Sequence, residues 1–300
     1  SAAFTITPQV TPTTQPAAAS GTVSLGDLTV NRMGFGAMRL TGSGVWGDPP
    51  DREGAKAVLR RAVELGVTLI DTAASYGPEV NEELVAETLH PYPEGLVVAT
   101  KGGLTRPGPG RWQPDGRPET LRESLEGSLR RLRLERIDLY QLHSVDPQVP
   151  LEESVGALAE LQRQGKIRHV GLSNVDARQL ATAQEIVPVV SVQNRYNVGD
   201  RYWDRVLDAC ERAGIAFLPW FPLALGALSS ATGRLAEIAR SHGGTPAQVA
   251  LAWLLRRSPV MAPIPGTSSV EHLEEDIAAT ELELTDAEFA SLSRAAESSL

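Results

Sequence analysis

Short apolar, β-branched runs alternate with amphipathic helical patterns along most of the chain. The apolar runs cover residues 33–35, 67–70, 96–100, 137–142, 167–172, 189–193, 215–219 and 260–264. Helical patterns follow these runs near Asp51, Asn81, Pro118, Leu151, Asp176, Asp200, Pro246 and Val270. Glycines mark several of the turns that lead from a helix into the next strand, at Gly66, Gly165 and Gly214. Eight strand–helix units in succession predict an α/β fold, a closed (β/α)₈ TIM barrel.

The main alternative is an open, nine-stranded, doubly wound sheet. That class of fold often carries a G-x-G-x-x-G turn directly after its first strand. The chain has no such motif there, so the pattern favours the barrel.

Two segments fall outside the eight units. Residues 21–30 have the pattern of a β-hairpin closed by Gly26 and Asp27, which would cover the amino end of the barrel as a plug. The stretch after Thr285 has the pattern of an amphipathic helix, with Asp286 and Glu288 near its start. We therefore expect an N-terminal β-hairpin plug and an extra C-terminal helix on the flank of the barrel.

The first twenty residues differ in composition from the rest of the chain. Residues 1–20 are rich in Ala, Thr and Pro and contain no charged side chain. They lack the basic start and the compact apolar core of a signal peptide, so we expect a flexible tail. Residues 21–300 are expected to form one domain, because 300 residues with 42% hydrophobic content suit a single barrel of about 250 residues.

Charge and cysteine content narrow the classes of partner. The net charge of −9, without any Lys/Arg-rich run, argues against binding to nucleic acid or to a membrane surface. No stretch approaches the roughly 20 apolar residues that a membrane-spanning helix needs. Cys210 is the single cysteine, which excludes an intrachain disulfide and suits a core thiol in a reducing, cytoplasmic compartment. We expect a small-molecule ligand and assign no metal site.

Ionisable side chains stand where three of the apolar runs end. Asp71 ends one run and Tyr76 follows it in the next turn, Lys101 ends the next run, and His143 ends the one after that. In a parallel sheet these ends share one edge, so the four side chains should converge there. A phenol has an ordinary pKa of about 10, and a neighbouring lysine cation, kept charged by a carboxylate, would favour its deprotonated form. A histidine beside them can hold a carbonyl oxygen that receives a proton.

Each of these residues alone has a structural explanation. A lysine at a strand end is usually solvated, and a tyrosine near a turn or a histidine after an apolar strand usually serves packing. Four such residues at successive strand ends are hard to obtain without a shared function. The pattern indicates an active site for proton chemistry.

The four segments, in this order, resemble the aldo-keto reductase family. The D-T-A-x-x-Y-G motif is present at Asp71–Gly77, and it is followed by the strand-ending Lys101 and by the segment from Leu139 to His143. The resemblance runs from about Val23 to the C-terminus. It implies a barrel enzyme that reduces an aldehyde or ketone to an alcohol, with a hydride from nicotinamide C4 and a proton from Tyr76. Lys101 and Asp71 would lower the pKa of the phenol, and His143 would orient the carbonyl. The implied cofactor is NADPH, with NADH possible.

The remaining strand ends carry residues that suit a nicotinamide. Ser173, Asn174 and Gln193 offer amide and hydroxyl groups for a carboxamide, which both donates and accepts hydrogen bonds. Trp220 can stack on the nicotinamide ring, as an aromatic residue does at the matching position in the family. The alternative for Trp220 is a core tryptophan beside Phe217 and Phe221.

The turn before the helix near Val270 suits an anion. Its free N–H groups and the hydroxyls of Thr267, Ser268 and Ser269 can hold a phosphate at the helix N-terminus, and the resemblance places the 2′-phosphate of NADP there. Gly266 stands where the family often has Lys, and His272 where it often has Arg, so we expect only a modest preference for NADPH. The cofactor contacts implied by the resemblance are Ala37, Met38, Ser173, Asn174, Gln193, Trp220, Phe221, Pro222, Leu223, Gly226, Gly266, Thr267, Ser268, His272, Glu275 and Asp276.

Substrate selection should depend on the loops at the same edge. Trp46 and Trp112 lie in Gly/Pro-rich loops and are candidate walls of an apolar substrate pocket. The segment between Leu223 and a helix near Arg234 is short, so we expect no long lid over the cofactor.

Two other functions remain open for this pattern. One is a regulatory subunit that binds the nucleotide as a redox sensor and has little turnover, although such a sensor has no need of Tyr76. The other is a barrel isomerase or lyase that uses the same residues as acid and base without a nicotinamide. A reductase and a redox sensor would both bind NADPH, whereas the isomerase or lyase would not, so NADPH binding distinguishes it from the other two.

Overall fold

The computed structural model describes residues 15–224, 228, 233–295 and 300, and it contains a curled parallel sheet at its centre. The strands of this sheet are β3 (Phe35–Gly36), β4 (Leu69–Asp71), β5 (Val97–Gly102), β8 (Ile137–Leu142), β9 (Ile167–Ser173), β10 (Val189–Gln193) and β11 (Ala216–Phe217). They lie side by side in chain order, and each pairs in parallel with the next. This order is the one that successive right-handed strand–helix units produce.

The segment 260–264 closes the sheet into a barrel between β11 and β3. On one side Phe217 donates to the Val260 carbonyl at 2.9 Å, and on the other Gly34 donates to the Pro263 carbonyl at 2.9 Å. Pro263 and Pro265 have no N–H to donate, so toward β3 they only accept hydrogen bonds, from Gly34 and Gly36, and this eighth position is not a regular strand. The predicted TIM barrel is confirmed.

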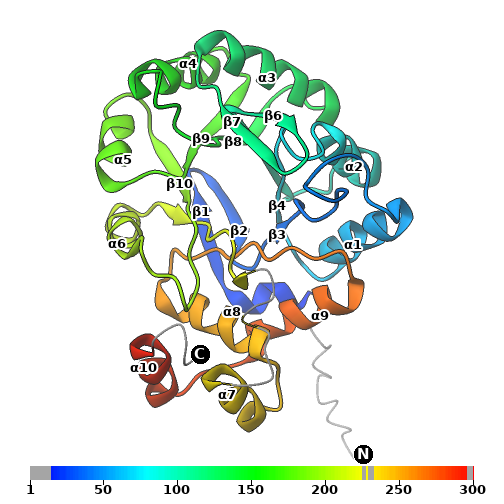
Figure 1. Cartoon of the computed structure of the whole chain (residues 1–300), viewed down its shortest axis with the longest axis vertical. Helices are drawn as coiled ribbons and strands as arrows, with labels where there is room; N and C mark the ends of the chain where they lie inside the picture. The colour runs from blue at the N-terminus through cyan, green and yellow to red at the C-terminus, as the bar shows by residue number, and fades with distance from the viewer. Residues whose placement is uncertain (1–14, 225–227, 229–232, 296–299) are drawn as a thin grey trace, which may run out of the picture.

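In the part of the chain that the structure describes, eight α-helices surround the sheet and two more lie outside this ring (Figure 1). The ring consists of α1 (Arg52–Glu64), α2 (Val80–Leu89), α3 (Pro118–Leu132), α4 (Leu151–Arg163), α5 (Ala177–Gln184), α6 (Asp204–Ala213), α8 (Pro246–Arg257) and α9 (Val270–Ala278). Most begin where the sequence predicts. α6 begins four residues after Asp200, because backbone hydrogen bonds between Asp200 and Asn197 hold that segment in a turn. No helix among the described residues is long and apolar enough to cross a bilayer.

The outer helices are α7 (Arg234–His242) and α10 (Asp286–Arg294). Thr285 caps α10 in a reciprocal pair of hydrogen bonds with Glu288. The expected C-terminal helix is therefore confirmed. It packs on α8, where the rings of Trp253 and Phe289 stack with their centroids 5.9 Å apart. The helix expected near Arg234 is α7.

A hairpin covers the amino end of the barrel, as predicted. Its strands are β1 (Thr22–Leu25) and β2 (Leu28–Asn31), which pair in antiparallel fashion around Gly26. Gly26 has a φ of +63°, and a Cβ there would collide with the ring of His169. Side chains of the hairpin form a buried cluster inside the barrel with strand residues such as Leu69 and Leu139. The hairpin thus closes the floor beneath the site.

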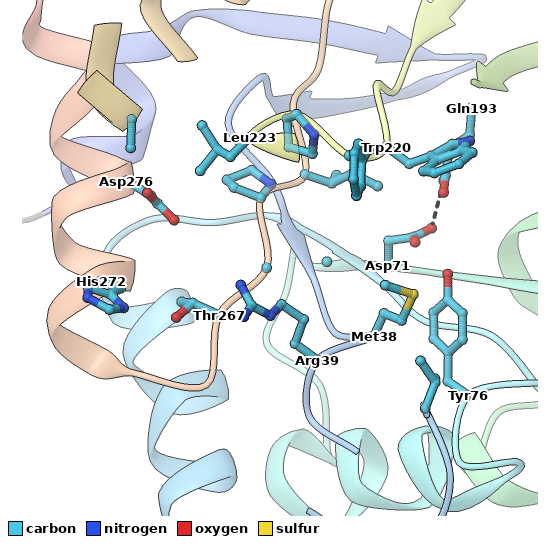
Figure 2. Close-up of a pocket in the computed structure, with 18 of the residues that line it drawn as sticks. Met38, Arg39, Asp71, Tyr76, Gln193, Trp220, Leu223, Thr267, His272 and Asp276 are labelled. Atoms are coloured by element: carbon cyan, nitrogen blue, oxygen red, sulfur yellow. Dashed lines mark hydrogen bonds between the residues drawn. The ribbon is translucent and has the colours of Figure 1, made fainter. Parts of the chain in front are cut away.

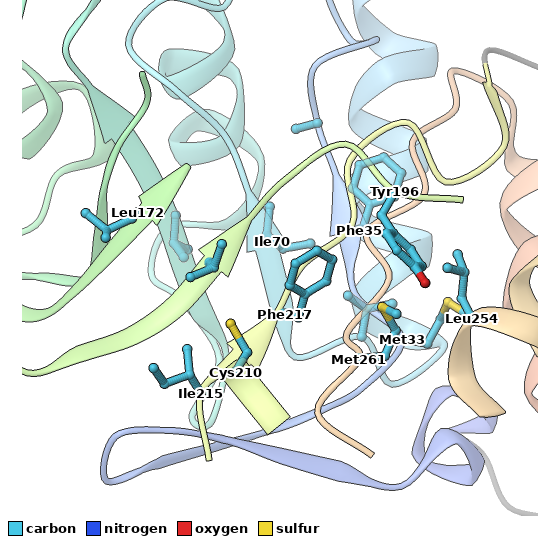
Figure 3. Close-up of a cluster of buried hydrophobic side chains, with 14 of the residues drawn as sticks. Met33, Phe35, Ile70, Leu172, Tyr196, Cys210, Ile215, Phe217, Leu254 and Met261 are labelled. Atoms are coloured by element: carbon cyan, nitrogen blue, oxygen red, sulfur yellow. The ribbon is translucent and has the colours of Figure 1, made fainter. Parts of the chain in front are cut away.

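A larger core fills the space between the sheet and the helices. Part of it is drawn in Figure 3, with Met33, Phe35, Ile70, Tyr196, Phe217, Leu254 and Met261. Cys210 lies in this core, and burial raises the pKa of its thiol to about 12. The expectation of a core thiol is confirmed.

The structure of the N-terminal segment differs in part from the prediction. The composition of residues 1–20 predicts a flexible tail, but Pro16–Ser20 form a 3₁₀ helix, η1. Ala17 is fully buried, and its N–H donates to the Leu65 carbonyl at 2.9 Å. Small side chains let this segment pack closely at the end of α1, which the low-complexity composition did not indicate. The first fourteen residues lie outside the described part of the chain.

A second hairpin stands where the sequence suggested a plain loop. Its strands are β6 (Leu104–Gly108) and β7 (Arg111–Pro114). Arg106 lies over the Trp112 ring, with Cζ 3.8 Å from the centroid. The same guanidinium donates to the carbonyls of Val45 and Ser75 at 2.7 and 2.8 Å. These bonds tie the hairpin to the loops that follow β3 and β4.

Candidate active site

The four predicted side chains converge at the carboxyl edge of the barrel. Asp71 is the last residue of β4, Lys101 lies near the end of β5, and His143 directly follows β8. Tyr76 comes from the turn after β4. The exposed fractions are 2% for Asp71, 6% for Tyr76, 0% for Lys101 and 8% for His143. The structure therefore brings together four polar groups that are almost fully removed from bulk water.

Lys101 is the centre of this cluster. Its Nζ donates to Asp71 Oδ2 at 2.6 Å, to the Thr72 carbonyl at 3.1 Å and to Tyr76 Oη at 2.9 Å. All three ammonium protons thus have a partner. Burial by itself lowers the pKa of Lys101, but Asp71 and Tyr76 outweigh burial and hold that pKa above its ordinary value. The lysine therefore keeps its charge beside the phenol.

Burial and two neighbouring charges determine the protonation state of the Tyr76 phenol. Burial raises its pKa above the ordinary value of about 10. Lys101 acts in the opposite direction, as the sequence indicated, but burial and the charge of Asp71 together outweigh it. The phenol is therefore protonated at neutral pH, with a cation in place for the phenolate that proton donation would leave.

His143 is a neutral hydrogen-bonding group. Burial, together with the charges of Lys101 and Arg106, holds its pKa well below the ordinary value. Ser75 Oγ lies 3.2 Å from His143 Nδ1. If the hydroxyl donates this hydrogen bond, Nε2 carries the ring proton and can donate to an oxygen in the cavity.

A cavity of about 890 Å³ leads from this cluster to α9. Figure 2 shows Asp71 and Tyr76 at one end and His272 and Asp276 at the other. Its volume lies in the range of small-molecule sites. The predicted cofactor residues that line it are Met38, Ser173, Asn174, Gln193, Trp220, Phe221, Pro222, Leu223, Gly266, Thr267, His272, Glu275 and Asp276.

Three of the predicted cofactor and substrate contacts do not line the cavity. Ala37 is fully buried, and its N–H donates to the Asp71 carbonyl at 2.9 Å, so it helps to hold the backbone of Asp71 in place. Ser268 is exposed on the turn and does not line the cavity, whereas its neighbour Thr267 does. Trp46 does not line the cavity either, whereas the adjacent Val45 does. Trp112 does line it. Gly226 lies outside the described residues.

Hydrogen bonds fix the side chains next to the tetrad. Asn174 Nδ2 donates to the His143 carbonyl at 2.9 Å, and Asn174 Oδ1 accepts from Trp220 Nε1 at 2.9 Å. Trp220 is therefore held at the cavity wall and is not a core tryptophan. Ser173 Oγ donates to the Gln193 carbonyl at 2.8 Å. The amide of Gln193 in turn reaches Asp71 Oδ1 at 3.2 Å, which links this group to the tetrad.

Arg39 is a cavity residue that the sequence reasoning missed. It follows Met38 in the loop after β3, and Figure 2 shows its guanidinium directed toward Thr267. A Cβ on Gly266 would lie 2.5 Å from the Gly36 carbonyl oxygen and 3.9 Å from Arg39 Cγ. A lysine therefore does not fit at position 266 without backbone movement, and Arg39 supplies a positive charge on that side of the turn.

Asp276 titrates in an unusual range. Burial, with a contribution from Glu275, raises its pKa to about 7, while Arg39 lowers it. The unfolded chain has an aspartate pKa of about 3.9. Between about pH 4 and pH 7 the folded protein therefore binds more protons than the unfolded chain, so the free energy of unfolding falls as the pH rises through this window.

We expect Asp276→Asn to stabilise the protein more at pH 8 than at pH 5. The difference between the two gains should be about 2.6 kcal/mol, because the wild-type carboxylate is charged and buried only at the higher pH. Urea unfolding at both pH values measures it. Glu271→Gln, at an exposed position of the same helix, is the matched control. A gain of the same size at both pH values would contradict the assignment of the raised pKa to Asp276.

Comparison with known proteins shows which protein family has this fold and this site. The aldo/keto reductase family model matches residues 32–297. An uncharacterized oxidoreductase of Schizosaccharomyces pombe is 50% identical over 276 residues, which are 92% of this chain and 90% of that protein. Pyridoxine 4-dehydrogenase of Escherichia coli is 46% identical over 274 residues, 89% of this chain and 95% of that protein. The crystal structure of an aldo-keto reductase from Klebsiella pneumoniae in complex with NADPH covers 91% of this chain and 94% of its own, at 28% identity and a TM-score of 0.77.

The chain belongs to the aldo-keto reductase family of oxidoreductases. The predicted resemblance is confirmed.

Proposed function

We propose that this chain reduces an aldehyde or ketone to an alcohol with NADPH, and that Tyr76 donates the proton. The observation that carries the proposal is the hydrogen bond of 2.9 Å between Lys101 Nζ and Tyr76 Oη at one end of the long cavity. A buried acid beside a fixed cation is the arrangement that proton donation to a carbonyl oxygen requires. The Klebsiella relative in complex with NADPH supports the choice of cofactor.

The cavity residues fit NADPH along its length. Gln193 and Asn174 offer amides at the end where the tetrad lies, and Trp220 offers a ring for stacking. At the other end Thr267, the N-terminus of α9 and Arg39 suit phosphate groups. When bound, NADPH supplies the hydride that the reduction needs.

The residues of the chain perform the remaining chemistry. His143 donates a hydrogen bond to the carbonyl oxygen and orients it toward Tyr76. Tyr76 gives its proton to that oxygen as negative charge develops there. Lys101 stabilises the resulting phenolate, and Asp71 holds the lysine in place through the bond of 2.6 Å. The burial of the cluster excludes water and strengthens each of these interactions.

For the substrate we propose a planar aromatic aldehyde, with pyridoxal as the first compound to test. The E. coli relative is named for the dehydrogenation of pyridoxine at position 4, and the reverse reaction consumes pyridoxal. The rings of Trp112, Tyr76 and His143 surround the reacting end of the cavity, with centroid distances of 5.8 to 6.3 Å between them. Aromatic walls of this kind favour a flat ring.

Trp112→Ala tests the substrate class. We expect kcat/KM for pyridoxal to fall about tenfold, because the variant loses an aromatic contact and the apolar area around it. The value for a short aliphatic aldehyde should change much less. Trp46→Ala is the matched control, because Trp46 lies near Arg106 but does not line the cavity. Equal losses for both aldehydes would contradict the aromatic preference.

His272→Arg tests the position of the 2′-phosphate. His272 is exposed at the first turn of α9 and lines the cavity. A guanidinium there would add a charge-assisted hydrogen bond, which contributes about 1.5 to 3 kcal/mol. The preference for NADPH over NADH should therefore rise about tenfold or more. KM values for both nucleotides measure it, with His272→Gln as the uncharged control. An arginine variant without any gain would show that the phosphate does not lie at this turn.

A further inference from the structure

Gln141 is a fully buried amide inside the barrel, next to the tetrad. It lies on β8, and His143 directly follows the end of that strand. Gln141 Nε2 donates to Asp71 Oδ1 at 2.9 Å, and Gln141 Oε1 accepts from Gln193 Nε2 at 2.9 Å. Gln141 therefore connects a member of the tetrad with a residue of the cavity wall.

The charge of Asp71 sets the direction of every bond in this chain of amides. An ionised carboxylate only accepts hydrogen bonds, so the nitrogen of Gln141 must face Asp71 and its oxygen must face Gln193. The nitrogen of Gln193 must then face Gln141 and Asp71, where its two protons have partners at 2.9 and 3.2 Å. The oxygen of Gln193 is the atom left over, and among the described residues it accepts no hydrogen bond.

A glycine makes the contact between the two glutamines possible. Gln141 and Gln193 come from β8 and β10, and β9 lies between these strands. Gly171 of β9 is paired with Gln141 in the register of the sheet. A Cβ on Gly171 would collide with Ser191 Oγ and would lie 3.1 Å from Gln141 Cγ. The missing side chain leaves the space through which the two amides meet above β9.

We propose that Gln141 is a positioning residue that holds the Gln193 side chain with its carbonyl oxygen toward the cavity. There this oxygen would accept a hydrogen bond from the amide nitrogen of a nicotinamide. The inference rests on the proposed function, because it assigns a role in binding the nicotinamide end of NADPH. In this arrangement the Asp71 carboxylate, which holds Lys101, also orients the amides that would recognise the cofactor.

Nucleotide binding tests this role without a measurement of turnover. For Gln141→Leu we expect the Kd of NADPH, measured by fluorescence titration, to rise about five- to tenfold, the effect of a hydrogen bond of ordinary strength. The Kd of adenosine 2′,5′-bisphosphate, which lacks the nicotinamide, should stay within about twofold of wild type. Gln141→Met, which is closer in length to glutamine, serves if the leucine variant does not fold.

The double variant shows whether Gln141 acts through Gln193. If it does, Gln141→Leu should cause no further loss of NADPH affinity in a Gln193→Leu background. Equal NADPH affinities in wild type and Gln141→Leu would overturn the inference. So would an equal loss of affinity for adenosine 2′,5′-bisphosphate, or a double variant in which the losses of NADPH affinity caused by the two single substitutions add up. A wild-type protein that binds no NADPH would instead refute the proposed function, so the two failures are distinguishable.

Discussion

Replacement of Tyr76 by phenylalanine should lower kcat for aldehyde reduction by a factor of about 10² to 10⁴, the usual contribution of a positioned general acid. The variant loses the hydroxyl that lies 2.9 Å from Lys101 Nζ and keeps the ring that packs between Trp112 and His143. NADPH affinity should therefore change little. Steady-state kinetics with pyridoxal and a fluorescence titration with NADPH measure the two quantities.

Tyr140→Phe is the matched control for this variant. Tyr140 is a fully buried tyrosine of β8, but it belongs to the core between the sheet and the helices and does not line the cavity. Loss of its hydroxyl should leave kcat near the wild-type value. A Tyr76→Phe protein that retained more than about a tenth of wild-type turnover would exclude Tyr76 as the proton donor.

Lys101→Met should cause the second large effect, on both activity and stability. The substitution leaves Asp71 as a buried charge without its partner, which typically costs about 3 to 5 kcal/mol of unfolding free energy. It also removes the cation that opposes the effect of burial on Tyr76. The pKa of the phenol should rise further, so the basic limb of the pH profile of reduction should move to higher pH while kcat falls by about 10² or more.

A second substitution separates the chemistry of Lys101 from its structural role. Asp71→Asn combined with Lys101→Met removes both charges, so most of the lost stability should return while activity remains low. Urea unfolding and pH profiles of kcat provide the two measurements. Lys166→Met, which breaks a partly exposed pair with Glu126, is the control and should cost less than about 1 kcal/mol. An unchanged pH profile in Lys101→Met would show that the lysine does not tune the acid.

Local signals in the sequence predicted the barrel and its tetrad. The strand bounds of β8 and β10 agree with the runs 137–142 and 189–193, because strands covered on both faces are rich in apolar residues, even where they carry a buried polar residue such as Gln141 or Gln193. The tetrad could be found because each member ends such a run or follows it within one turn, and parallel strand ends must meet. Asp176 and Thr285, near which the sequence predicts helix starts, are likewise the N-caps of α5 and α10.

The features that sequence reasoning missed depend on contacts between distant segments. The β6–β7 hairpin contains Pro107 and Pro109, which hide its strand pattern, and the distant carbonyls of Val45 and Ser75 help to hold it through Arg106. Arg39 matters because Gly266, 227 positions later, has no room for a side chain. Gln141 does not stand out within its strand in the sequence. Its partner Gln193 lies two strands away in the sheet, on the other side of Gly171. No local pattern encodes these pairs.

The most direct test of the proposed function is the transfer of deuterium from NADPH labelled at C4 to pyridoxal and to a panel of aromatic and aliphatic aldehydes, followed by mass spectrometry of the alcohols. We expect the alcohol formed by wild type to carry deuterium, and Tyr76→Phe to form far less of it at equal nucleotide saturation. NADPH binding without any labelled alcohol across the panel would contradict a reductase and favour a redox-sensing subunit. Conversion of a carbonyl compound without nucleotide would favour an isomerase or lyase.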